Sequence, residues 1–169
     1  MSKRIRQYLG LITAVLAYYL IHEGAHLIYA LSIGVFRQIN FMGVGVQVDV
    51  NAQQMSNLQM GVFCLVGAVA TTIAAYVLTL AAPQICKSSS KVFKACMYYI
   101  TLIMLLLDPL YLSVLCGFFG GGDMNGIALL FPEVAARILF GVLLLIHSLV
   151  FWKVILPKYK RAFSENEVQ

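Results

Sequence analysis

Two histidines and a glutamate near the start of the chain have the types and spacing of a metal-dependent hydrolase. Residues 22–26, His-Glu-Gly-Ala-His, fit the pattern H-E-x-x-H, which is typical of zinc hydrolases. Residues four apart lie on one face of a helix, so His22 and His26 can bind the same metal ion. Glu23 projects beside them, where it can take a proton from a water molecule that the metal activates. The pattern therefore predicts a zinc site with Glu23 as its catalytic residue.

The residues on both sides of this pattern are apolar. Tyr18-Tyr19-Leu20-Ile21 precedes it and Leu27-Ile28-Tyr29-Ala30-Leu31 follows it, which predicts a helix that crosses a membrane. Ionisable side chains are costly to bury in a bilayer and mark functional sites there. We therefore expect His22, Glu23 and His26 to have a functional role.

The composition of the whole chain is that of an integral membrane protein. Of its 169 residues, 61% are hydrophobic and 11% are charged, whereas a soluble domain carries roughly 25% charged residues. A membrane span needs about 20 residues, so the chain has room for a single bundle of about four spans. The net charge of +5 does not indicate nucleic-acid binding, because the basic residues lie at the ends of the apolar runs.

The apolar runs define the fold that we expect. It is an all-α integral membrane protein whose single domain covers residues 1–169. The run after the basic N-terminus is longer than the apolar core of a secretory signal, about 7–15 residues, so we interpret it as a retained span. Pro83 and Pro157 are expected to end the second and last spans, and the tail from Lys158 is expected to fray. The four spans are predicted at 8–33, 58–82, 93–118 and 132–156.

A polar segment with several glycines separates the first two spans. Residues 41–50 alternate apolar with small or polar side chains, which predicts a short strand or hairpin. The exposed edge of a strand can pair with an extended peptide through main-chain hydrogen bonds; the alternative is a plain connecting hairpin. The candidate substrate-binding residues are Gly43, Val44, Gly45, Val46 and Asn125.

The distribution of basic residues predicts the orientation in the membrane. Positive side chains gather in cytoplasmic loops, and only Arg37 and Arg137 fall on the side opposite to the termini. Both termini are thus expected to be cytoplasmic, in a multi-pass protein of the bacterial plasma membrane. The basic residues expected on the cytoplasmic side are Lys3, Arg4, Arg6, Lys87, Lys91, Lys94, Lys153, Lys158, Lys160 and Arg161.

A catalytic zinc site needs a third protein ligand and an open position for water. Asp123 is the preferred candidate, because Gly120–Gly122 allow a sharp turn that would carry its carboxylate back into the bundle. Asp108 is the alternative ligand, or else accepts the second N–H of a ligating histidine. His147 is expected to form a hydrogen bond within the bundle or to face its interior, without binding metal.

Three segments resemble the site-2 protease family of intramembrane zinc metalloproteases. Residues 22–26 match the H-E-x-x-H of its first core helix, and residues 66–70, Val-Gly-Ala-Val-Ala, occupy the place of a Gly-Pro-rich segment on the second. Gly121-Gly122-Asp123, followed by Asn125-Gly126, is similar to the L-D-G motif of the third. Asp108-Pro109 stands where the family has an asparagine and a proline, at a longer spacing. The likeness covers about residues 8–130 and includes no PDZ or CBS domain.

This resemblance implies a function. The third zinc ligand would be Asp123, with one Zn²⁺ per chain, and Glu23 would serve a zinc-dependent endopeptidase. The substrate would be a transmembrane protein or peptide in the lipid bilayer, cut in or near its membrane segment, and the oligomeric state stays open. The alternative is a non-proteolytic metal-binding membrane protein or a metal transporter. A haem-binding bundle would leave Glu23 and Asp123 without a role.

Overall fold

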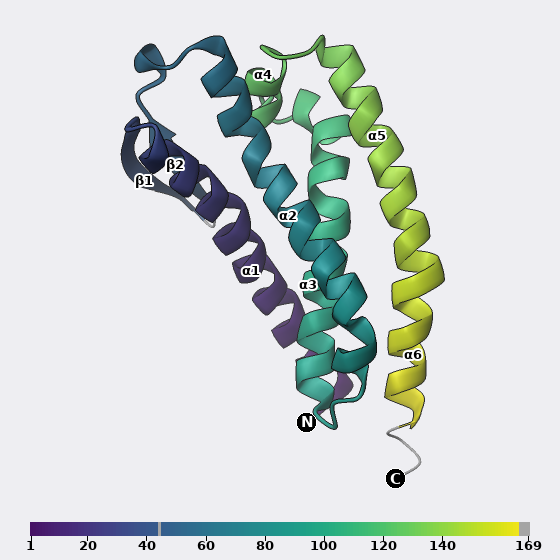
Figure 1. Ribbon diagram of the computed structural model, residues 1–169. Coiled ribbons are helices and arrows are strands. Elements are labelled where there is room, and N and C mark those ends of the chain that lie inside the picture. Colours follow the sequence, from purple (N-terminus) through teal and green to yellow (C-terminus); the bar gives the residue numbers. More distant parts are fainter. Residues whose placement is uncertain (44, 166–169) are drawn as a thin grey trace.

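The computed structural model describes residues 1–43 and 45–165, which form a bundle of long helices with a small hairpin at one end (Figure 1). In the described part of the chain, four helices are long and apolar enough to cross a membrane. The fourth is continuous through three segments, with a π-helical turn between α5 and α6. Their bounds are α1 Lys3–Ser32, α2 Asn57–Cys86, α3 Lys91–Ser113, α5 Glu133–Val150, η3 Phe151–Ile155 and α6 Leu156–Glu165.

Serine side chains fix where three of these helices begin. The hydroxyl oxygen of Ser2 accepts from the N–H of Ile5, and that of Ser90 accepts from the N–H of Phe93. Before α2, Ser56 accepts from the N–H of Gln59 while the Gln59 side chain accepts from the N–H of Ser56. Such caps satisfy backbone donors that a helix leaves without internal partners.

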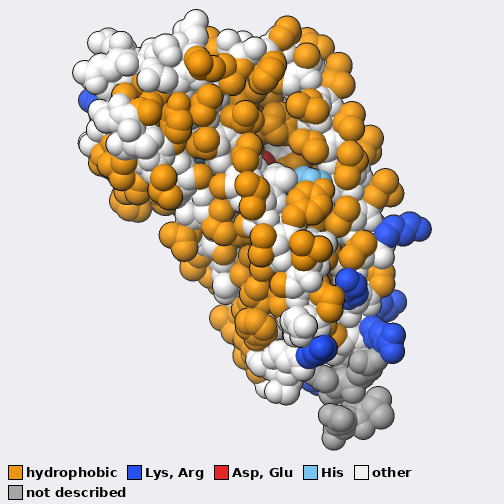
Figure 2. Space-filling model, viewed as in Figure 1, with side chains coloured by type: hydrophobic (Ala, Val, Ile, Leu, Met, Phe, Trp, Pro, Cys, Tyr) orange, Lys and Arg blue, Asp and Glu red, His pale blue; other side chains and the backbone are white. Residues whose placement is uncertain are grey.

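The outside of the bundle is largely apolar. Figure 2 shows hydrophobic side chains over most of one face, with lysines and arginines gathered mainly at the end that holds α6. Leu20, Leu80 and Leu145 are exposed by 77%, 80% and 66%. A soluble protein seldom exposes so large an apolar surface. The fold is therefore compatible with a multi-pass membrane protein.

The predicted hairpin is present after α1. Strand β1 (Phe36–Met42) pairs antiparallel with β2 (Gly45–Val50), and the turn uses Gly43 at a positive φ of 63°. Val48 is buried and belongs to the same hydrophobic cluster as Ala30 of α1. The hairpin therefore lies against the last part of α1, at the opposite end of the bundle from α6 (Figure 1). A short 3₁₀ helix, η1 (Ala52–Gln54), leads from it to α2.

The helix ends predicted at Pro83 and Pro157 are wrong. Helix α2 continues to Cys86, because the buried side chain of Ile85 holds its last turn against the core. Pro157 lies within α6, directly after the π-helical turn, whose wider spacing accommodates a residue that lacks an N–H.

The predicted fraying of the tail is wrong as far as Glu165. The side chain of Tyr159 in α6 is buried, and the buried ammonium group of Lys94 donates to the carbonyl of Ala162 at 2.8 Å. These contacts tie α6 to α3. Residues 166–169 lie outside the described residues.

His147 compensates for a proline inside α3. The carbonyl of Leu105 would normally accept from the N–H of residue 109, but Pro109 has none. His147 Nδ1 lies 2.7 Å from that carbonyl oxygen and can donate its hydrogen to it. His147 is fully buried, so it forms a hydrogen bond within the bundle, far along the chain from the other histidines.

The pairing of His147 with Pro109 predicts a specific pattern of stability. His147→Leu should lower the free energy of unfolding in mixed micelles by about 1–2 kcal/mol, because the Leu105 carbonyl loses its partner. In a Pro109→Ala background the alanine N–H can take over, so the same substitution should cost clearly less. Equal costs in both backgrounds would show that His147 stabilises the bundle by packing alone.

Candidate metal centre

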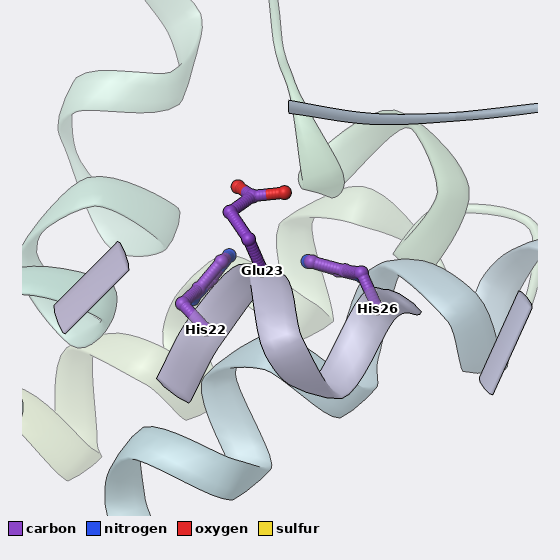
Figure 3. A group of neighbouring side chains, drawn as sticks. All are labelled: His22, Glu23 and His26. Atoms are coloured by element: carbon purple, nitrogen blue, oxygen red, sulfur yellow. The ribbon is translucent and has the colours of Figure 1, made fainter. Parts of the chain in front are cut away.

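Helix α1 presents Tyr18, His22 and His26 on one face, because each is four residues from the next. His22 and His26 are buried, with 7% and 3% of their surfaces exposed. The ring of Tyr18 stacks on that of His22, and the ring of His26 packs against Phe63 of α2. Figure 3 shows both imidazoles and the Glu23 carboxylate directed to the same side of α1. Their possible ligand atoms all lie within 4.8 Å of one another.

Asp123 comes from a distant part of the chain to the same point. It is the first residue of the short helix α4 (Asp123–Ile127), and its Oδ2 lies 3.1 Å from His22 Nε2 and 3.5 Å from His26 Nε2. Burial acts to raise the pKa of Asp123, but its contacts with the two histidines outweigh burial and lower it to about 2. A charged carboxylate therefore faces both imidazoles at neutral pH.

The path from α3 to Asp123 is fixed by an arginine and by glycines. Arg137 of α5 donates from Nε to the carbonyl of Ser113 at 3.1 Å and from its guanidinium to that of Val114 at 3.4 Å, which caps the end of α3. After η2 (Leu115–Gly117), residues Gly120–Gly122 all have positive φ values, between 49° and 87°. Such values strain any residue with a Cβ atom. The turn they form directs Asp123 inward.

The three converging atoms suit a zinc ion. Tetrahedral zinc, with bonds of about 2.0–2.1 Å, keeps its ligand atoms ~3.3 Å apart, and the Asp123 oxygen lies 3.1 and 3.5 Å from the two nitrogens. Gly67 of α2 packs closely against both imidazoles. A Cβ atom there would lie 2.6 Å from His26 Nε2 and 2.7 Å from His22 Nε2. The spacing of the donors thus fits a two-histidine, one-carboxylate metal site.

Asp108 occupies a different place from the converging donors. It is buried in α3, where its carboxylate accepts hydrogen bonds from the hydroxyls of Tyr18 and Thr71. Its Oδ1 lies 3.3 Å from His22 Nδ1, the nitrogen that faces away from Asp123, without hydrogen-bond geometry. A carboxylate beside Nδ1 favours a proton there and leaves Nε2 free to bind a metal. This placement favours the orienting role of Asp108 over the ligand role.

Glu23 contacts the hairpin. Its Oε2 accepts from the N–H of Val48 at 3.0 Å, across the edge of β2 that is not paired with β1. A cavity of about 230 Å³ lies next to this contact. Its walls come from α1, β2, α2 and α3, from the turn before α4 and from the first residue of α4. They are formed by Glu23, His26, Val46, Gln47, Val48, Phe63, Tyr111, Gly122 and Asp123.

The predicted substrate-binding residues are only partly brought together. Val46 lines the cavity, and Gly45 precedes it at the start of β2, whereas Gly43 lies in the exposed hairpin turn. Val44 lies outside the described residues. Asn125 is exposed, and its amide donates to the carbonyl of Gly120 at 3.0 Å, so it braces the glycine turn.

Comparisons with family models, with curated proteins and with solved structures find no match to this chain.

Proposed function

We propose that this chain is an intramembrane zinc metalloprotease of the site-2 protease type. It would hydrolyse a peptide bond in or near a transmembrane segment of another membrane protein. The observation that carries the proposal is the convergence of Asp123 Oδ2 on the Nε2 atoms of His22 and His26. Two imidazoles and a carboxylate are a donor set typical of catalytic zinc. Bound there, zinc would polarise a carbonyl group and lower the pKa of water.

Glu23 is the residue for proton transfer. Its carboxylate lies next to both histidines without belonging to the closest set of donors. A base in this place can take a proton from the attacking water and return it to the leaving amine. Asp108, held by Tyr18 and Thr71, would position His22 from behind.

The free edge of β2 supports a peptide substrate. Val46, Gln47 and Val48 form one wall of the cavity that Glu23, His26 and Asp123 also line. A transmembrane helix hides its peptide bonds in its own hydrogen bonds, so the substrate must unwind before it can be cut. An unwound segment can regain main-chain hydrogen bonds by pairing with an exposed strand.

The charge pattern that predicts the orientation supports a metal site in the half of the membrane away from the termini. The start of α1 and the end of α6 lie at one end of the bundle, and α4 and the hairpin lie at the other (Figure 1). With both termini in the cytoplasm, water would reach Glu23 from the outer face of a bacterial plasma membrane. Water would need only a short path to Glu23, through the hairpin end of the bundle.

Zinc content measured by mass spectrometry on detergent-purified protein tests this proposal. The unaltered chain should hold about one zinc per chain, and Asp123→Asn should lose it because the carboxylate ligand is gone. Asp108→Asn also removes one negative charge, but from a residue that lies behind His22 and does not bind the metal. This variant should keep about one zinc per chain, with an affinity that is weaker by about 10–100-fold. Zinc loss from Asp108→Asn alone would move the third ligand into α3 and contradict the assignment.

The protease proposal also requires that the zinc-loaded protein cleaves a substrate. Reporter proteins with single transmembrane segments, reconstituted together with the zinc-loaded chain, should be cut in or near the membrane, and a chelator should stop the reaction. The competing proposal is a metal transporter, for which the same vesicles would take up zinc and leave the reporters intact. Zinc uptake without cleavage would refute the proposed protease function and would still support the metal site.

A further inference from the structure

A second cavity lies at the opposite end of the bundle from the metal site. It has a volume of about 380 Å³ and lies between the start of α1, the start of α3 and the face of α6. Four basic side chains from these three helices line it: Lys3, Arg6, Lys91 and Lys160. The fold therefore brings together positive charges that are far apart in the sequence. We propose that this basic cavity binds the phosphate headgroup of an anionic phospholipid.

Among the side chains that the structure describes, the charges in the cavity have no protein counter-ion. No described acidic side chain lines the cavity, and none of the four basic groups forms an ion pair with a described carboxylate. The described carboxylates lie elsewhere, mostly around the metal site and the hairpin. Like charges gathered without a partner repel one another. An anion from outside would relieve this repulsion.

The apolar side chains in the remaining walls favour the binding of a lipid over the binding of a free anion. Tyr98, Leu156, Tyr159 and Phe163 contribute rings and an aliphatic side chain to the cavity. A free phosphate ion gains nothing from such walls, whereas the glycerol and upper acyl chain of a phospholipid can pack on them. Basic pockets between membrane helices on the cytoplasmic side suit anionic headgroups. Tyrosines are also common at the level of the headgroups.

The position in the membrane fits this ligand. The positive-inside rule places this end of the bundle at the cytoplasmic leaflet, where anionic lipids give the surface its negative potential. The cavity is independent of the metal centre, so the proposal does not rest on proteolysis. A lipid held there would link α1, which carries the histidines, to α3 and α6.

Lipid binding to the full-length chain can be measured directly by native mass spectrometry. Delipidated protein in detergent would be titrated with phosphatidylglycerol, with phosphatidylcholine and with inorganic phosphate. We expect phosphatidylglycerol to bind at least about tenfold more tightly than phosphatidylcholine. Displacement of the lipid by millimolar phosphate would identify a free-anion site and overturn the proposal.

Two double variants distinguish the effect of the cavity's charges on lipid binding from the effect of other surface charges. Lys91→Gln with Lys160→Gln removes two cavity cations and should weaken phosphatidylglycerol binding about tenfold or more. Lys87→Gln with Lys158→Gln removes two exposed cations at the same end that do not line the cavity, and should change binding by less than about twofold. Equal losses in both pairs would overturn the site. Circular dichroism melts should show that both pairs remain folded.

Discussion

Replacing Glu23 by glutamine should lower the rate of peptide hydrolysis by about 10²–10⁴-fold, while the zinc content stays at about one per chain. Glutamine keeps the shape of the side chain and can still accept from the N–H of Val48, whose bond to Glu23 is 3.0 Å long. It cannot take a proton from water at neutral pH. Cleavage of a membrane-anchored reporter and zinc content, measured on the same samples, check both parts of this result.

The two readouts separate the possible roles of Glu23. Loss of zinc together with activity would make Glu23 a metal ligand, in conflict with the closer approach of Asp123 to both histidines. Full activity in the variant would remove Glu23 from the proton transfer and contradict the mechanism. Only inactive protein with normal zinc supports the role of general base.

Adding one methyl group to α2 should weaken the binding of zinc. Gly67→Ala places a Cβ atom 2.6 Å from His26 Nε2 and 2.7 Å from His22 Nε2, closer than atoms in contact can lie. The histidines must move, so zinc affinity should fall by about 10–100-fold, as when a supporting partner is lost. Activity at limiting zinc should fall with it. A titration with a competing chelator measures the affinity.

Gly24→Ala is the matched control for this substitution. Gly24 lies within the H-E-x-x-H segment itself, yet a Cβ atom there would meet nothing within 4 Å. Alanine favours a helix interior over glycine by about 1 kcal/mol, so both variants should remain folded. Zinc binding should be normal in Gly24→Ala and weak in Gly67→Ala. The opposite order would mean that α2 does not approach the histidines as the structure has it.

Most of the fold could be predicted from the sequence, since long apolar runs have few alternatives in length and position. The helix ends were harder to predict, because they depend on tertiary contacts. Around Pro157, a π-helical turn precedes the proline, and the buried side chain of Tyr159 holds α6 in place. Neither the turn nor the burial is visible in the local sequence.

The candidate metal-binding residues could be predicted where spacing along one helix, or the glycine turn before Asp123, indicates the geometry. His22, Glu23 and His26 follow from the pattern. Tyr18 has the same four-residue spacing from His22, and this spacing is the signal in the sequence that indicates its place beside the site. Gly67 could not have been found as a site residue, because only the packing of α2 on α1 reveals that it makes room for two imidazoles.

The hydrogen bond between Val48 and Glu23 would also set where a peptide is cut. Alternate residues of a strand present their main-chain groups to the same edge, so an added peptide would pair beside Val46 while the N–H of Val48 stays with Glu23. Its backbone would then have one register relative to the carboxylate, whatever its side chains. The hairpin would thus fix the position at which the proposed protease cuts an unwound segment, and the choice of position would depend little on the sequence of that segment.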